Sequence, residues 1–198
     1  MLKRLFALTR PTEEQKFNIQ HPAVRHDLAV GVKGLMAEAA ASGRDIVILC
    51  IGTDRSTGDA LGPLTGSKLR SLRQYPHIFG TLADPVHATN LPDTLRFIGG
   101  LFANPYLIAV DACLGKLENV GCVTLGPGPL RPGAAVNKDL PPVGDACITG
   151  IVNVGGFMEH LVLQSTRLSL VFDMAEIIAY GLAYGLSEIA AARPAGMD

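Results

Sequence analysis

The chain has 198 residues, of which 48% are hydrophobic and 18% charged, and its formal net charge is −1 at pH 7. This length and composition predict a globular protein with a substantial core and exclude a disordered chain. Because Lys and Arg are scattered and nearly balanced by acids, we expect no nucleic-acid partner. None of the four cysteines forms a CxxC pair, and no uninterrupted apolar run reaches the roughly 18 residues of a membrane helix, so we expect a cytoplasmic protein with no membrane partner.

After residue 20 the chain alternates between apolar residues at helical spacing and short runs that are apolar on both faces. Residues 45–51 (DIVILCI) and 106–110 (YLIAV) are of the second kind, which is typical of buried strands in a parallel sheet. In chain order we expect an arm at 1–20, a helix at 21–42, a strand at 45–51, a helix at 60–74, a strand at 79–82, a helix at 91–101, strands at 106–110, 119–125 and 146–152, and helices at 155–164 and 170–192.

Strands that alternate with helices predict an α/β fold, a three-layer α/β/α sandwich with a mostly parallel central sheet of the phosphorylase/hydrolase-like kind. No internal repeat or linker divides the sequence, so we expect a single domain over residues 21–198 after an N-terminal arm at 1–20. In open α/β sheets, ligands bind beyond the carboxyl ends of the strands, and the residues that follow each strand are therefore the first candidates for a site.

Two aspartates follow the two buried strands. Asp59 ends the loop after residues 45–51, and Asp111 comes directly after residues 106–110. If these strands are neighbours, the two carboxyl groups converge on one crevice, where they can share a proton, orient a water or hold a cation. Each aspartate also has a structural interpretation, Asp59 as a helix N-cap and Asp111 as a hydrogen-bond acceptor for a neighbouring loop.

The loop after the first buried strand lacks the signatures of other catalytic classes. Gly52, Gly58 and Gly62 permit close backbone approach, but their spacing matches neither a dinucleotide-binding fingerprint nor a Walker A loop. The GxSxG nucleophile elbow of α/β hydrolases does not occur either. His87, in the loop at 84–90, is a candidate for lining the crevice, with a local loop hydrogen bond as the alternative.

Three segments carry a family resemblance: IGTDRSTGDALGP at 51–63, DPVHATNL at 84–91 and VDACLG at 110–115. Together they resemble the YyaC-type sporulation proteins of spore-forming Firmicutes, and segments at 132–141, 150–153 and 166–170 fit in the same order. Those proteins are similar to the germination protease, which degrades small acid-soluble spore proteins. They are more distantly similar to the maturation endopeptidases of nickel–iron hydrogenases.

The resemblance implies acid-dependent peptide hydrolysis. In this group of proteins, an acid after the first strand and an aspartate after a later strand are functional, and those roles fall on Asp59 and Asp111. The implied mechanism is that the two carboxyl groups position and deprotonate a water and then protonate the leaving amine.

Five further residues are expected to hold the substrate. The resemblance implies Asp54, Asn90 and Asn137 as orienting or substrate-binding neighbours, and we add His87. Hydrogenase endopeptidases carry a histidine after a later strand, where Asn153 stands nearest in this sequence. Because an amide is a poorer metal ligand than imidazole, we place Asn153 with the substrate-binding residues and expect no metal and no cofactor.

Three functions fit these residues. The first is a cytosolic, sporulation-associated peptidase that acts on a protein or peptide substrate, with small spore proteins suspected. The second is a non-catalytic peptide- or partner-binding sporulation protein on the same fold, and the third is a hydrolase or phosphorylase of a small molecule. The last helix carries more apolar side chains than one sheet face requires, so a homo-oligomer is a further candidate, with core packing as the alternative.

Overall fold

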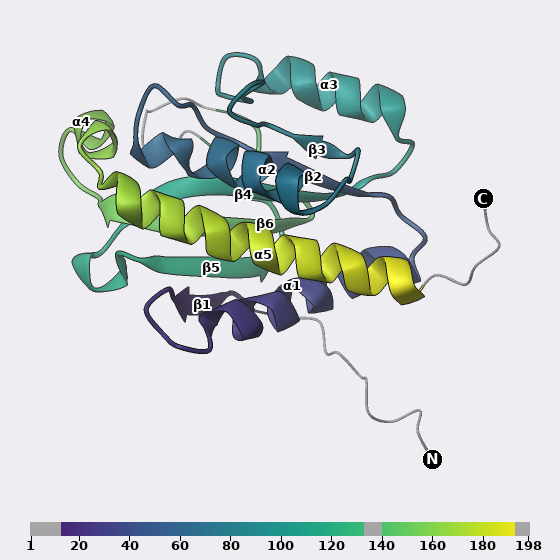
Figure 1. Cartoon of the computed structure of the whole chain (residues 1–198). Coiled ribbons are helices and arrows are strands. Elements are labelled where there is room, and N and C mark those ends of the chain that lie inside the picture. Colours follow the sequence, from purple (N-terminus) through teal and green to yellow (C-terminus); the bar gives the residue numbers. More distant parts are fainter. Residues whose placement is uncertain (1–12, 133–139, 193–198) are drawn as a thin grey trace.

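The computed structural model describes residues 13–132 and 140–192 of the chain, in which one sheet lies between helices (Figure 1). Its elements are β1 (Gln15–Asn18), α1 (Val24–Ala41), β2 (Ile46–Cys50), η1 (Gly58–Ala60), α2 (Leu61–Leu72), β3 (Ile78–Phe79), α3 (Leu91–Leu101), β4 (Tyr106–Gly115), η2 (Leu117–Asn119), β5 (Cys122–Pro127), β6 (Ala146–Val154), α4 (Glu159–Gln164) and α5 (Leu168–Ala192), where η marks a short 3-10 helix. The expected α/β fold class is confirmed.

The strands form one mixed sheet in the order β1-β5-β6-β4-β2-β3. Strands β3, β2, β4 and β6 are parallel to one another, whereas β5 runs antiparallel to β6 and β1 antiparallel to β5. All five residues of β2 (IVILC) are buried, as expected for a strand that is apolar on both faces and has neighbours on both sides. The sheet is therefore parallel over the four strands that surround the two candidate aspartates.

Helices cover the two faces of the sheet unequally (Figure 1). On one face α1, α2 and α5 share a core with sheet residues such as Ile48 and Val110. On the other face α3 contributes Leu91 and Ile98, which pack against a smaller cluster that includes Val47. These are the three layers that the sequence predicts.

The long helix α5 lies between α1 and α2 and contacts both along its length (Figure 1). By length and composition alone Leu168–Ala191 is apolar enough to cross a membrane. The sequence did not indicate this, because Asp173 and Glu176 interrupt its apolar residues. Half of its most apolar window is buried inside the protein, and the buried side chains include Ile178 and Leu182. Packing within the chain thus uses much of the apolar surface that suggested an oligomer.

Some element boundaries differ from those expected because pairing partners lie far away in the sequence. β1 falls inside residues 1–20, where an arm was expected, and pairs with β5. β4 continues to Gly115, since β6 supplies pairing partners after β2 has ended. β3 is shorter than expected and is followed by Gly80 at φ +83°, where a Cβ would lie 1.8 Å from the carbonyl oxygen of Cys50.

Candidate active site

The loop after β2 folds back tightly against the strand and places Asp59. Gly52 has φ +144°, and a Cβ there would lie 2.0 Å from the carbonyl oxygen of Asp59. The same carbonyl accepts a hydrogen bond from the Thr53 N–H at 3.1 Å. At Gly62, in the first turn of α2, a Cβ would lie 2.0 Å from the carbonyl oxygen of Ile51. The close approach that the glycines predicted is therefore present, and it fixes Asp59 in η1 at the carboxyl end of β2.

Asp111 lies inside β4, and not after it as the sequence suggested. Strand β2 ends beside Val110, where Cys50 is the last paired residue and the Ile51 N–H donates to the Val110 carbonyl at 2.7 Å. β4 goes on because Asp111 pairs with Thr149 of β6. Asp111 therefore stands one residue past the end of β2, at the edge of the sheet where we expected it.

Asp59 and Asp111, the carboxyl pair, line one cavity of about 580 Å³ at this edge. The negative charge of Asp59 contributes to the raised pKa of Asp111, so the two groups are close enough to interact. Strands β2 and β4 are neighbours in the sheet, and the two aspartates lie together, as we expected for adjacent strands. The other lining residues are Ile51, Gly52, Thr53, Arg55, His87, Ala88, Thr89, Ala112, Cys113, Leu114, Arg131, Pro132, Leu140 and Glu159.

The two carboxyl groups differ in how strongly they hold a proton. Burial first, and then the charge of Asp59, raise the pKa of Asp111 to about 8, against the lowering effect of a 2.8 Å hydrogen bond that the Ala112 N–H donates to Asp111 Oδ1. Burial also raises the pKa of Asp59, while the hydroxyl of Ser56 lowers it. Ser56 Oγ is itself buried and has no hydrogen bond of good geometry. Near neutral pH Asp111 therefore keeps its proton.

Neither structural interpretation of the two aspartates accounts for them fully. The N-cap position of α2 is occupied by Ala60, and no side chain caps that helix end. Asp111 accepts one hydrogen bond, from the residue next to it, and none from a neighbouring loop among the bonds within residues 13–132 and 140–192. Stabilisation of local structure does not explain why a second carboxyl group lies beside the first.

The substrate-binding residues expected from the sequence do not all reach the cavity. His87 lines it. Asp54 is exposed in the loop after β2 and is absent from the cavity lining. Asn137 lies outside the described residues, so its expected role stays a prediction.

Asn90 and Asn153 hold loops in place. Asn90 Oδ1 accepts from the His87 N–H at 2.8 Å, and its Nδ2 donates to the Pro85 carbonyl at 3.0 Å. Asn90 occupies the N-cap position of α3, but its side chain binds the preceding loop and not the helix end. The amide of Asn153 donates to the Val162 carbonyl at 3.3 Å and thereby ties β6 to α4. Both side-chain amides thus bond to backbone groups, and neither residue lines the cavity, so their expected role in substrate binding stays a prediction.

A metal site would need several ligands in one place. In the part of the chain that the structure describes, no group of three or more His, Cys, Asp or Glu side chains is arranged to hold a metal ion.

Cys113 lines the cavity two residues after Asp111, and burial raises the pKa of its thiol. Its Sγ lies 3.6 Å from Thr149 Oγ1, and that hydroxyl lies 2.7 Å from Thr124 Oγ1.

Three charged lining residues were not expected: Arg55, Arg131 and Glu159. Arg55 lies in the glycine-rich loop after β2, close in sequence to Asp59. That proximity could have predicted that Arg55 lines the same cavity. Arg131 belongs to the Pro- and Gly-rich segment after β5, and Glu159 begins α4. Nothing local in the sequence connects those two segments to the carboxyl ends of β2 and β4.

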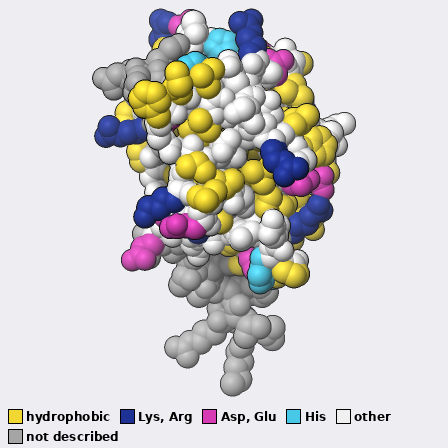
Figure 2. All heavy atoms as spheres, turned by 90° about the vertical axis from the view of Figure 1, so that its left-hand side faces the viewer, with side chains coloured by type: hydrophobic (Ala, Val, Ile, Leu, Met, Phe, Trp, Pro, Cys, Tyr) yellow, Lys and Arg dark blue, Asp and Glu magenta, His cyan; other side chains and the backbone are white. Residues whose placement is uncertain are grey.

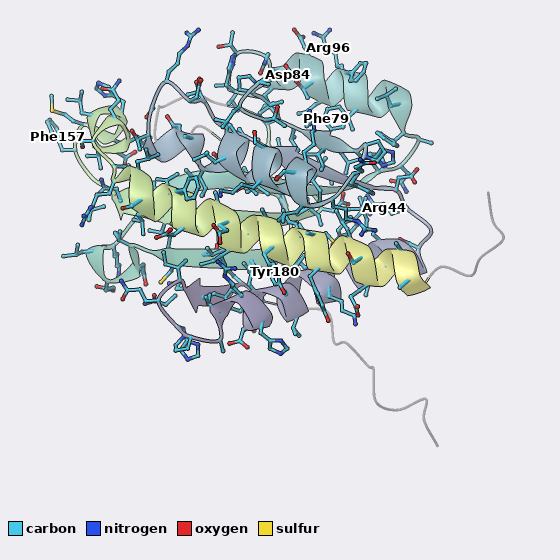
Figure 3. The ribbon with its side chains drawn as sticks, in the orientation of Figure 1. Arg44, Phe79, Asp84, Arg96, Phe157 and Tyr180 are labelled. Carbon is cyan, nitrogen blue, oxygen red and sulfur yellow. The ribbon has the colours of Figure 1, made fainter. Side chains whose placement is uncertain are left out.

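Apolar side chains surround the turn between β6 and α4. Phe157, Met158 and Leu161, which we call the α4 rim, are 88%, 57% and 44% exposed. Met158 has φ +55°, a left-handed conformation that bulky side chains rarely adopt. Phe157 extends from the end of the molecule in Figure 3, and Figure 2 looks onto that end, where hydrophobic side chains gather between charged ones. Because Glu159 lines the cavity, the α4 rim adjoins it.

Comparisons with known proteins connect the chain to one family and one known fold. A family model described as a protein of unknown function (DUF1256) matches residues 23–181. The chain is 59% identical over 143 residues to the uncharacterized protein YyaC of Bacillus subtilis (strain 168). The aligned region covers 72% of this chain and 70% of that protein. Among solved structures it is similar to the nickel–iron hydrogenase maturation protease HycI from Thermococcus kodakarensis KOD1, with a TM-score of 0.50 and 21% identity over 77% of this chain and 99% of that chain. The resemblance to YyaC-type proteins is confirmed, and the likeness to HycI shows the fold alone.

Proposed function

We propose that this chain, which belongs to the DUF1256 family, is a peptidase that hydrolyses peptide bonds with Asp59 and Asp111. The observation that supports the proposal best is the carboxyl pair itself, two interacting aspartates in one cavity at the carboxyl edge of a parallel sheet. The fold is that of a hydrogenase maturation protease, which makes peptide hydrolysis the leading chemistry for such a pair.

We propose different roles for the two carboxyl groups, supported by the shifts of their pKa values. Asp111 keeps its proton up to a pH of about 8 and is the general acid. Asp59, whose pKa burial also raises, against the lowering effect of the Ser56 hydroxyl, is the general base that takes a proton from a water. The hydroxide oxygen forms a bond to the peptide carbonyl carbon, the C–N bond breaks, and the leaving nitrogen receives the proton of Asp111. A proton then moves from Asp59 back to Asp111, through solvent, and restores the starting state.

The surroundings of the cavity favour a polypeptide over a small metabolite. A volume of about 580 Å³ suits either a small molecule or a few residues of a chain. The α4 rim, however, extends the apolar surface outward from the cavity, and exposed apolar patches are typical of protein-binding surfaces. Small spore proteins in the cytoplasm of a sporulating cell are the substrates that we propose, on the resemblance to the germination protease.

The test is digestion of an extracted spore-protein mixture, followed by mass spectrometry of the new peptide ends. Wild-type protein is expected to create cleavage sites that Asp59→Asn and Asp111→Asn each fail to create while remaining folded by circular dichroism. Asp84→Asn is the matched control, because Asp84 is exposed and outside the cavity lining (Figure 3). Full activity in either catalytic variant would exclude the proposed mechanism.

The second candidate function is a non-catalytic protein that binds a peptide or partner in the same cavity. The exposure of Phe157 and its neighbours in the α4 rim favours it, since that surface binds a chain whether or not the chain is cut. Binding of spore proteins without any new peptide end, in wild type and variants alike, would support this candidate over the peptidase.

A further inference from the structure

Two arginines share the cavity with the carboxyl pair. Arg55, from the loop after β2, and Arg131, from the segment after β5, both line it. Neither forms an ion pair with any residue in the ranges 13–132 and 140–192. Arg25, Arg44 and Arg96, by contrast, each pair with a carboxylate elsewhere on the protein. Both arginines are exposed, and the cavity is therefore lined by two residues whose guanidinium donors are available to a ligand.

The catalytic carboxyl groups do not neutralise these arginines. A guanidinium beside a carboxyl group lowers its pKa. Among the described groups that shift the pKa values of Asp59 and Asp111 there is no arginine, and the net shift of both is upward. The third acid of the cavity, Glu159, accepts a hydrogen bond from the Gly156 N–H at 3.1 Å and belongs to the α4 side. The two arginines and the carboxyl pair thus line one cavity, and neither arginine lowers the pKa of Asp59 or Asp111.

We propose that Arg55 and Arg131 form an anion subsite, which binds a carboxylate of the substrate in the same cavity as the carboxyl pair. This inference rests on the proposed peptidase function and names its substrate class, an acidic peptide. The planar fork of a guanidinium matches a carboxylate with two parallel hydrogen bonds. A singly charged carboxylate also meets less repulsion from Asp59 and Glu159 than a doubly charged phosphate would.

The carboxylate of a peptide substrate can belong to an Asp or Glu side chain or to the C-terminus. Binding of three peptide pools distinguishes these two sources. Each pool consists of random hexapeptides with an uncharged fluorophore. The first contains Asp and Glu and is amidated at its C-terminus. The second replaces these by Asn and Gln and is also amidated, and the third is the second pool with a free C-terminal carboxylate. Fluorescence anisotropy reports binding to the full chain carrying Asp111→Asn, in which turnover is removed.

We expect at least one carboxylate-bearing pool to bind about tenfold more tightly than the neutral amidated pool at physiological ionic strength. Arg55→Gln and Arg131→Gln should each remove most of that preference, by weakening binding of the carboxylate-bearing pools much more than binding of the neutral pool. Arg55→Lys, which keeps the charge but loses the fork, should retain part of it. Arg96→Gln is the matched control, because Arg96 is exposed on α3 and absent from the cavity lining (Figure 3).

Equal binding of the three pools, or no binding of any, would overturn the anion subsite. A preference for carboxylate that survives both Arg→Gln substitutions would overturn it as well. Carboxylate-selective binding that depends on Arg55 and Arg131, in a protein whose wild type cleaves nothing, would uphold the subsite and exclude the peptidase. The two proposals therefore fail in different measurements.

Discussion

Replacing Asp111 by Asn should make the protein more stable at alkaline pH and leave its stability unchanged in acid. The substitution keeps the shape of the side chain and removes its ability to ionise. In wild type, ionisation of Asp111 places a negative charge in a partly buried position beside Asp59, with one N–H as its hydrogen-bond donor among the described residues. The amide group that Asp111→Asn introduces never carries that charge, so the difference between the two proteins should depend on pH.

The sign and size follow from linkage between protonation and folding. The carboxyl pKa is 3.8 without the protein environment and about 8 in the folded protein, so the native state binds the proton more tightly over that interval. The stability supplied by the protonated form is complete below pH 3.8 and is lost as the pH rises through about 8. At about 1.36 kcal/mol per pKa unit, the shift sets an upper limit of roughly 6 kcal/mol. Hydration of the partly exposed carboxylate reduces this, and we expect about 2–3 kcal/mol.

The assay is urea unfolding of wild type and Asp111→Asn between pH 4 and pH 9, with the m-value as a check on two-state behaviour. At pH 4 the two free energies of unfolding should agree within about 0.5 kcal/mol, and at pH 9 the variant should exceed wild type by about 2–3 kcal/mol. Asp84→Asn, at an exposed position outside the cavity lining, is the matched control. A difference that is the same at pH 4 and pH 9 would refute the burial and charge argument for Asp111.

Three further predictions use the same protein. Peptide hydrolysis should decline as the pH rises through about 8, because the general acid Asp111 loses its proton there; a rate profile flat from pH 7 to pH 10 would contradict that role. Gly52→Ala should lower the free energy of unfolding by at least about 3 kcal/mol, because a Cβ at φ +144° would collide with the Asp59 carbonyl oxygen. Urea unfolding measures this, and a variant as stable as wild type would contradict the prediction. Asn90→Ala should lower the free energy of unfolding by about 1–2 kcal/mol through loss of its two bonds to the His87 loop, and an unchanged urea midpoint would argue against this.

The sequence predicted the placement of the carboxyl pair because that placement follows from two local patterns. Residues 45–51 and 106–110 are apolar on both faces, which requires interior strands of a parallel sheet, and an acid stands close after each. The glycines of the intervening loop added that the backbone folds back closely. The exact end of β4 did not follow from this, because it depends on pairing with β6, which is supplied by residues some forty positions later in the chain.

The expected role of the asparagines in substrate binding stays a prediction. A short polar side chain near a site is equally suited to binding a ligand and to holding backbone groups in a loop, and the sequence does not separate the two uses. In the structure Asn90 holds the His87 loop and Asn153 holds α4. Arg131 was not predicted, because it lies in the Pro- and Gly-rich segment after β5. That segment has no periodic pattern that would indicate where its side chains lie.

Another acid of the same sheet, Asp145 just before β6, shows why the carboxyl pair calls for a chemical explanation. Asp145 is also partly buried, and its oxygens are satisfied by two partners. Arg44 donates to its Oδ1 at 2.8 Å, and the Leu107 N–H donates to its Oδ2 at 2.9 Å. That is how a structural aspartate is stabilised. Asp111 has a second carboxyl group where Asp145 has a cation, although two arginines line the same cavity. The fold can supply an arginine to a carboxylate, and at the carboxyl pair it does not. Burial beside Asp59 therefore leaves Asp111 with a raised pKa, which is the condition that the proposed general acid needs.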